Sequence, residues 1–272
     1  MTGVDLSNYQ AGIDYAALKS ANIQFAILKI CEYNEDKSFQ KHYAGLKSQG
    51  IPVGAYIYTH AKTPEAVRAE ADKAIKILAG RALDLPLFLD MEADDINVSW
   101  KTSVLPVALA FGEYVSSRGM RWGIYANRSW WQNKLDVDAI RSAGGCVWCA
   151  AYNNTGAGIE CDIWQYTDKG KIQGCANNLD MNMAYDVFRE MWKTKLPAES
   201  QNSDETVESK SMCDVADGRT PESLHMAALL HNIGYDVLWL GLGPCITDYQ
   251  AKVGLPRTGK GDRATWDALS KG

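Results

Sequence analysis

The sequence lacks several features that define common functional classes. No stretch approaches the roughly 18 apolar residues that a membrane-spanning helix needs, so we expect no membrane insertion. Positive charge is not in excess, because 28 Lys and Arg residues stand against 33 Asp and Glu residues and give a net charge of −5. This balance gives no support for nucleic-acid binding, which would require a basic patch. A GxGxxG fingerprint and a P-loop lysine are also missing, which argues against nucleotide binding.

The N-terminus and the cysteines exclude two further classes. The first residues contain neither a basic n-region nor an apolar h-region, so we expect no secretory signal and synthesis in the cytoplasm. The seven cysteines are an odd number without framework spacing, which indicates reduced thiols. Cys146 and Cys149 form a CxxC pair, but they lie in an apolar run typical of a strand, where positions i and i+3 face opposite sides. Without a second CxxC or a nearby histidine, we expect neither a metal nor a cofactor.

What is present is an alternation of strand and helix patterns over the first two-thirds of the chain. Strands are expected at 3–7, 25–31, 53–58, 85–92 and 122–126, and helices at 14–21, 38–49, 64–80 and 105–117. A less regular segment then runs through residues 130–140. Three further strands, at 147–152, 163–167 and 179–183, are separated by polar intervals too short for ordinary crossover helices. We therefore predict an α/β barrel that begins with β/α units and closes with hairpin-like strands. An open doubly wound sheet is the alternative, but it needs helices throughout.

The composition changes after residue 195. Residues 196–212 contain four acids against one base and few large apolar side chains, as expected of a linker. Residues 213–272 have three short helical patterns, at 221–232, 244–253 and 262–269. A helical unit this small is marginally stable alone, and appended modules of this size usually bind or associate. We predict a barrel over 1–195, a linker over 196–212 and a small helical domain over 213–272.

Two acids end the buried strand at residues 85–92. Asp90 and Glu92 are spaced i, i+2, so their side chains point to the same side of the strand, about 7 Å apart along the chain. Like charges this close separate the two pKa values, so that one carboxyl stays ionised while the other holds a proton near neutral pH. A glycoside hydrolase needs such a pair. The alternative is that the two acids only cap the strand in solvent.

The carboxyl ends of the other predicted strands supply more acids and aromatic side chains. In a β/α-type barrel these ends provide the catalytic groups. Carboxylates act on glycosidic oxygens, and the C–H faces of pyranose rings pack on Trp and Tyr, so the set fits a sugar substrate. Core packing is the alternative for each aromatic residue. The candidate catalytic acids are Asp5, Asp90, Glu92 and Asp180, and the candidate binding residues are Lys29, Glu32, Tyr56, Tyr58, Tyr125, Trp148, Tyr152, Trp164 and Gln165.

Six motifs resemble those of the glycoside hydrolase family 25 muramidases, the Chalaropsis-type lysozymes common as phage endolysins and bacterial autolysins. The Asp-x-Ser-x-x-Gln pattern of residues 5–10 is the first, and it adds Gln10 to the binding candidates. The others, in the family's order, are at 25–29, 50–56, 89–92, 163–166 and 179–182. The resemblance implies an irregular (β/α)5β3 TIM-like barrel. One departure lies at residues 29–33, which read Lys-Ile-Cys-Glu-Tyr where the family commonly has Lys-Ala-Thr-Glu-Gly.

The resemblance also implies an activity, that of a lysozyme (N-acetylmuramidase). Glu92 would protonate the oxygen that leaves between N-acetylmuramic acid and N-acetylglucosamine in peptidoglycan, with Asp90 as the main cause of its raised pKa. Asp90 would assist the substrate's 2-acetamido group in a retaining mechanism, with a carboxylate nucleophile or an inverting water as alternatives. Asp5 and Asp180 would hold the ring or tune the central pair. A family 18-like chitinase is a rival, but its pattern needs an Asp where this chain has Phe88. A non-catalytic wall-binding protein is a second rival, which the four intact acids disfavour.

The C-terminal segment has a second resemblance. Residues 249–256 and 261–269 resemble the end of a three-helix peptidoglycan-binding domain, while the front half departs and contains an apolar patch at 237–240. Wall binding is therefore expected of this module, with self-association through the patch as the alternative. With no signal peptide, the resemblance implies an endolysin that waits in the cytoplasm for a holin-type pore. An autolysin exported by another route is the alternative.

Overall fold

The computed structural model describes residues 1–93, 101–173, 175–185, 230, 242–258, 260, 264–265 and 268. The chain forms two compact units, residues 1–199 and 200–272. The linker expected at 196–212, the apolar patch at 237–240 and most of the helices expected at 221–232 and 262–269 lie outside the described residues.

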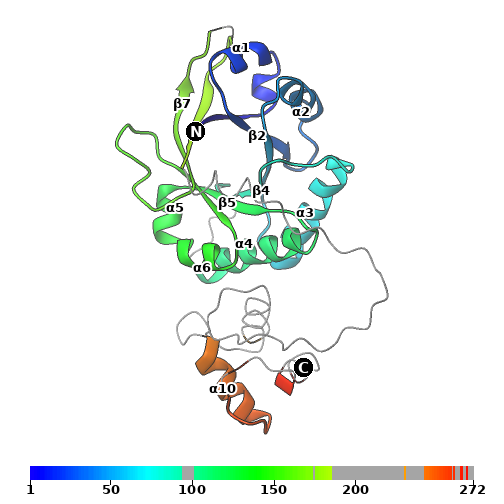
Figure 1. Ribbon diagram of the computed structural model, residues 1–272, viewed down its shortest axis with the longest axis vertical. Coiled ribbons are helices and arrows are strands. Elements are labelled where there is room, and N and C mark those ends of the chain that lie inside the picture. The colour runs from blue at the N-terminus through cyan, green and yellow to red at the C-terminus, as the bar shows by residue number, and fades with distance from the viewer. Residues whose placement is uncertain are drawn as a thin grey trace. The chain divides into compact units, whose positions relative to one another are not determined.

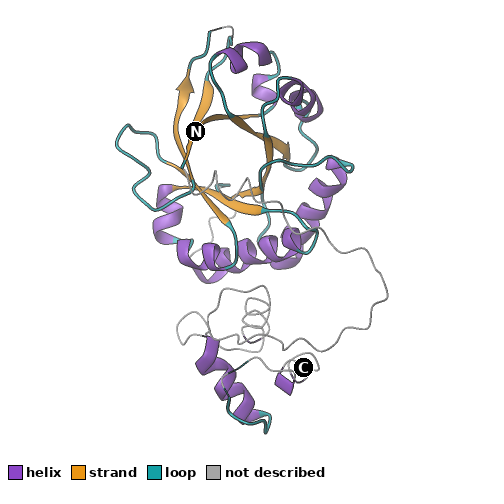
Figure 2. Ribbon diagram, in the orientation of Figure 1, coloured by secondary structure: helices purple, strands orange, loops and turns teal. Residues whose placement is uncertain are grey.

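The first unit is a closed barrel of eight strands, which confirms the predicted irregular barrel (Figures 1 and 2). Each of the first six strands pairs in parallel with the next, and the eighth runs antiparallel to both the seventh and the first. The strands are β1 (Thr2–Leu6), β2 (Phe25–Cys31), β3 (Val53–Tyr58), β4 (Leu87–Asp90), β5 (Trp122–Asn127), β6 (Cys146–Ala150), β7 (Ile163–Gly170) and β8 (Leu179–Ala184).

Helices lie outside the ring of strands over its first part (Figure 2). They are η1 (Asn8–Gln10), α1 (Tyr15–Ser20), α2 (Phe39–Ser48), α3 (Pro64–Leu78), α4 (Lys101–Ser116), α5 (Arg128–Asn133) and α6 (Val137–Ser142). Asp14 caps α1, and Thr63 caps α3 just before Pro64. None of the described helices is long and apolar enough to cross a membrane.

The segment expected to be irregular, residues 130–140, contains most of the two short helices α5 and α6. Asn127 accepts a hydrogen bond from the Trp130 amide, and Asp136 accepts one from the Ala139 amide, so both helices have side-chain caps. Each helix has only six residues, which is too short for a 3.6-residue apolar period to stand out. The capping residues Asn127 and Asp136 are the sequence signal that could have predicted these two helices.

Side chains alternate between the two surfaces of the barrel wall. Val4, Leu28 and Leu89 belong to the layer between strands and helices, whereas Phe25 and Phe88 fill the barrel interior. The interior is tightly packed, because a Cβ on Gly3 would lie 2.4 Å from the Phe25 ring and one on Gly123 would lie 2.4 Å from the Phe88 ring. Only glycine leaves room for these rings.

The inward positions change from apolar to polar along the strands. On β2 Ile27 is followed by Lys29, on β4 Phe88 is followed by Asp90, and on β7 Ile163 is followed by Gln165. The apolar rings therefore fill the amino-terminal part of the interior, and the polar groups gather at the carboxyl ends of the parallel strands. The same alternation puts Cys146 inside and Cys149 outside the barrel wall, as predicted for the CxxC pair.

The second unit contains α10 (Leu242–Lys252), close to the helix expected at 244–253. Cys245, Ile246 and Tyr249 are buried, and so is Gln250. The Gln250 amide donates to the hydroxyls of Thr258 and Thr265 and to the carbonyl of Lys260.

Candidate active site

Asp5 is the most firmly held of the four acids. It lies on β1, beside Asp180 in the register of β1 and β8. Its Oδ2 accepts hydrogen bonds from Gln165 Nε2 at 2.9 Å and from Asn182 Nδ2 at 2.8 Å. Burial raises the pKa of Asp5 well above its usual value and Asp180 adds to this, although the two amides lower it. The carboxyl group is therefore fixed in place, and the nearby charge of Asp180 makes it harder to ionise.

The two amides that hold Asp5 are themselves held by aromatic side chains. Trp148 Nε1 donates to Asn182 Oδ1 at 2.8 Å, and the hydroxyls of Tyr125 and Tyr152 donate to Gln165 Oε1 at 2.9 and 3.1 Å. These bonds fix which way each amide points, so both present N–H to the carboxylate. Asn182 was overlooked, although Asp180 was chosen from the same motif and the two share a face of β8.

Asp90 ends β4 and is only 5% exposed. Its Oδ1 is buried without a hydrogen-bond partner among the described residues. Burial, then the charges of Glu92 and Asp5, raise the pKa of Asp90 well above its usual value, and Lys29 offsets part of this. A buried carboxyl oxygen without a donor is costly to stability, and such strain is typical of functional sites.

Glu92 lies two residues beyond the end of β4 and is partly buried. Burial raises the pKa of Glu92, Asp180 raises it further and Lys29 lowers it. The expectation that Asp90 is the main cause is therefore wrong. Burial is the largest cause at both carboxyl groups, and at Asp90 the repulsion between Asp90 and Glu92 adds to it.

Asp180 completes the cluster from β8. Burial, and after it the charge of Asp168, raise the pKa of Asp180 to about 6. Three strands thus bring four carboxyl groups to one mouth of the barrel, as predicted. Each has a raised pKa, so the carboxyl groups hold protons to higher pH than free carboxyl groups do. No group of three or more His, Cys, Asp and Glu side chains within the described part of the chain is arranged to hold a metal ion.

A charged chain lies beside the acids at the ends of β2 and β3. Lys29 Nζ lies 2.6 Å from Glu32 Oε2, and His60 Nε2 lies 3.1 Å from Glu32 Oε1. Burial raises the pKa of Glu32, but the bonds from Lys29 and His60 outweigh it and the pKa lies below its usual value. Lys29 also lies over the Tyr58 ring, 4.8 Å from its centroid. His60 was overlooked because it follows β3 by two residues and matches no motif.

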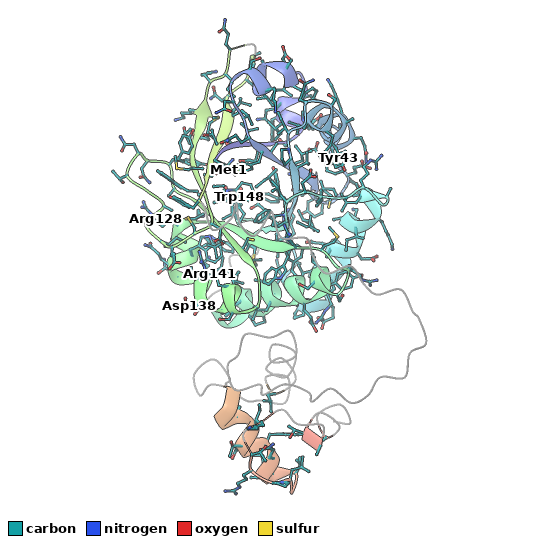
Figure 3. The ribbon with its side chains drawn as sticks, viewed as in Figure 1. Met1, Tyr43, Arg128, Asp138, Arg141 and Trp148 are labelled. Atoms are coloured by element: carbon teal, nitrogen blue, oxygen red, sulfur yellow. The ribbon has the colours of Figure 1, made fainter. Side chains whose placement is uncertain are left out.

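The predicted aromatic residues include two with exposed surface, Tyr56 and Tyr152, and two that are buried, Tyr125 and Trp148. Tyr56 is partly exposed in the barrel interior, and burial followed by the charges of Asp5 and Asp90 raises its pKa. Tyr152 is 55% exposed, while Tyr125 is buried. Trp148 is 1% exposed and lies inside the ring of strands (Figure 3), where it supports the Asn182 amide.

Two predicted residues are not brought to the acids. Trp164 packs in the layer outside the barrel wall and donates to the Ala151 carbonyl at 2.8 Å. Gln10 accepts a bond from the Ser7 amide at 3.0 Å in the capping box of η1, and its Nε2 lies 3.4 Å from the Asn178 carbonyl. Strand alternation gives the reason for Trp164, because its neighbour Gln165 points inward.

A closed β/α-type barrel with carboxyl groups that converge at one mouth defines a class, the barrel-type glycoside hydrolases; Asp180 reaches this mouth from the amino end of β8, because that strand is antiparallel. The chain matches the model of Glycosyl hydrolases family 25 over residues 4–175. It belongs to that family.

Individual relatives are distant. The chain is 23% identical over 192 residues to the autolytic lysozyme of Clostridium acetobutylicum, a match that covers 67% of this chain and 55% of that protein. It is 28% identical over 144 residues to the N,O-diacetylmuramidase of Chalaropsis sp., covering 48% of this chain and 68% of the relative. Among solved structures, the catalytic domain of endolysin ply40 from the Listeria monocytogenes bacteriophage P40 superposes with a TM-score of 0.62 at 25% identity. That match covers 71% of this chain and 98% of the other.

Proposed function

We propose that this protein hydrolyses the β-1,4 bond between N-acetylmuramic acid and N-acetylglucosamine in bacterial peptidoglycan. The observation that carries the proposal is the convergence of Asp5, Asp90, Glu92 and Asp180 at one barrel mouth, with raised pKa values. Carboxyl groups of this kind supply the acid and the anionic partner that glycosidic cleavage needs. Membership of family 25 and the names of the lysozyme and diacetylmuramidase relatives support peptidoglycan as the substrate.

Glu92 is the proposed general acid. It is partly exposed, so it can reach a glycosidic oxygen, and its raised pKa keeps a share of it protonated. Protonation of the leaving oxygen by a positioned acid is typically worth ~10²–10⁴-fold in rate. Lys29, which lowers the Glu92 pKa, limits how far the acid is weakened.

Asp90 is the proposed partner of the substrate's 2-acetamido group. Its Oδ1 is buried without a donor among the described residues, so it is available to accept an acetamido N–H. Asp90 takes up that proton as the acetamido oxygen attacks the anomeric carbon, while the glycosidic bond breaks and Glu92 protonates the leaving oxygen. Water, deprotonated by Glu92, then opens the resulting oxazoline at the same carbon and Asp90 returns its proton to the nitrogen, so the two displacements give net retention without a sugar–protein bond. A carboxylate nucleophile or an inverting water are the competing routes, and the stereochemistry of the product separates retention from inversion.

Asp5 and Asp180 are proposed to orient the ring and tune the central pair. Asp5 is held by two amides, and its charge raises the pKa of Asp90. The charge of Asp180 raises the pKa of Glu92. Tyr56, Tyr58 and Tyr152 are the proposed walls of the sugar subsites, because each retains some exposed surface near the acids.

The decisive experiment is Glu92→Gln, which keeps the side-chain shape and removes the proton. We expect loss of turbidity clearing on bacterial walls with an unchanged melting curve. Glu113→Gln is the matched control, since Glu113 is a largely exposed residue of α4 that pairs with Arg68 of α3. Mass spectrometry of the wild-type digest should find N-acetylmuramic acid at the new reducing ends. Full lytic activity of Glu92→Gln, or new reducing ends on N-acetylglucosamine, contradicts the proposal.

The C-terminal unit is proposed to tether the barrel to the wall. A tether raises the local concentration of substrate without adding contacts at the active site. Removal of residues 196–272 should lower activity on whole cells more than on soluble glycan fragments. Equal loss of activity on both substrates contradicts tethering. A change from an oligomeric mass for the full chain to a monomeric mass for the truncated chain favours self-association instead. Release of the protein to the wall through a holin-type pore is part of the same proposal.

A further inference from the structure

Tyr33 is an exposed aromatic residue at the site that neither the motifs nor the mechanism uses. It lies two residues after β2 in a tight turn, closed by the antiparallel bridge between Cys31 and Glu35 and by a bond from the Glu32 amide to the Asn34 carbonyl at 3.1 Å. Its side chain is 66% exposed. This is the position where the sequence departs from the common Lys-Ala-Thr-Glu-Gly pattern.

The Tyr33 ring is held although it is exposed. It stacks on the His60 ring with centroids 4.4 Å apart and an angle of 15° between the planes. His60 is fixed in turn by Glu32, which is bonded to Lys29. Lys73 on α3 donates to the Tyr33 carbonyl. A ring already ordered in this way loses little conformational entropy when a ligand packs on it.

The stack stands beside the acids. Lys29, at the other end of the charged chain, lies close enough to lower the pKa of both Asp90 and Glu92. Tyr152, another exposed tyrosine at this mouth, follows β6. Because β2 and β6 are four strands apart in a ring of eight, the two tyrosines flank the acids from opposite sides. An extended polymer that crosses the mouth would meet one tyrosine on each side.

We propose that Tyr33, backed by His60, packs against a sugar ring of the glycan strand beyond the two sugars joined by the cleaved bond. The inference rests on the proposed glycan-cleaving function and adds an outer subsite to it. The C–H face of a pyranose fits an aromatic ring, and the Tyr33 side chain stays 66% exposed while its ring stacks on His60. The subsite selects for strand length and leaves the chemical step unchanged.

The test compares strands of different length. Peptidoglycan strands stripped of stem peptides by an amidase are fractionated into the shortest cleaved oligomer and oligomers longer by two and four sugars. Tyr33→Ala should lower kcat/KM on the longer oligomers by roughly 3- to 10-fold, through KM, and by less than about 2-fold on the shortest. Tyr33→Phe and Tyr33→Trp, which keep a ring, should retain the length dependence of the wild type.

Tyr185→Ala is the matched control, because Tyr185 is an exposed tyrosine next to the end of β8, at the opposite mouth of the barrel. It should leave all rates unchanged. The subsite is overturned if Tyr33→Ala lowers kcat/KM equally on short and long strands, or does not lower it at all. It is also overturned if Tyr33→Phe lowers kcat/KM on long strands as much as Tyr33→Ala does. A loss seen only on strands that keep their stem peptides makes the ligand a peptide and also overturns it. If the wild type cuts no strand of any length, the proposed function itself fails.

Discussion

Two buried carboxyl groups at opposite ends of the same barrel differ in how they are paired. Asp162 precedes β7 at the amino-terminal end and is 3% exposed, and Asp90 ends β4 at the carboxyl end and is 5% exposed. Asp162 accepts a bond from the Val147 amide at 2.7 Å and one from Arg141 at 3.2 Å. Asp90 has a buried oxygen without a partner among the described residues and faces the charges of Glu92 and Asp5.

The difference separates a structural acid from a site acid. Burial raises the pKa of both, but the Val147 amide and Arg141 offset it at Asp162, whereas like charges add to it at Asp90. A buried carboxylate with donors links the strands around it, while one without donors destabilises the fold until a ligand supplies them. The carboxyl end of the barrel therefore gives up stability for chemistry.

Asp90→Asn should give the largest effect and the clearest contrast with Asp162. Activity on peptidoglycan should fall by at least ~10²-fold, because the amide cannot stabilise positive charge at the acetamido group. The melting temperature should not fall, since a repelled buried charge is removed. Asp138→Asn on the exposed surface of α6 is the control. A stable variant with wild-type rates breaks the assignment of Asp90 as a site acid.

Asp162→Ala should have the opposite profile. It leaves the Val147 amide and Arg141 without their acceptor, which should cost about 3 kcal/mol of unfolding free energy. Activity per folded molecule should stay within about twofold of the wild type, because Asp162 lies at the far end of the barrel. Urea unfolding monitored by tryptophan fluorescence measures the first quantity. A stability change below about 1 kcal/mol would remove the contrast between the two ends.

The pH dependence of stability should come from the site end. The pKa values of Asp5, Asp90, Glu92 and Asp180 are raised in the folded protein, so the folded state binds more protons than the unfolded state above about pH 4. Their contribution to stability is therefore greatest at low pH and is lost as pH rises through the folded pKa values, the one for Asp180 between about pH 4 and 6. Urea unfolding across this range should give a shallower decline for Asp90→Asn than for the wild type. Identical slopes would mean that Asp90 does not titrate with the fold.

Asp168→Asn should give the smallest effect. Asp168 is the charge that, after burial, raises the pKa of Asp180 to about 6. Without it, that pKa should fall only slightly, because the exposed Asp168 charge is screened by solvent. Carbon-detected NMR titration of the carboxyl groups measures the shift. A shift of the Asp180 pKa upward, or none at low salt, contradicts this account of the site's charges.

Much of the barrel could be predicted because its signals are local. The strands 25–31 and 53–58 match β2 and β3 residue for residue, and the expected helices 14–21 and 64–80 differ from α1 and α3 by one or two residues at their ends. Apolar runs, caps and breakers each act within a few residues, so the sequence exposes them directly. The segment 130–140 was misjudged because its two helices are too short for a clear period.

The four acids and their shared mouth could likewise be predicted, because strand ends and two-residue spacing decide which side chains meet. What only the tertiary structure decided is how each group is held. Asn182 and Gln165 reach Asp5 across more than 150 residues of chain, Trp164 points away from the site, and burial outweighs Asp90 in setting the pKa of Glu92. Hydrogen-bond partners and desolvation depend on neighbours brought together by closure of the barrel, and no local pattern encodes them. The sequence determined which residues stand at the mouth, and the fold determined which of them are supported and which carboxyl oxygen is left unpartnered.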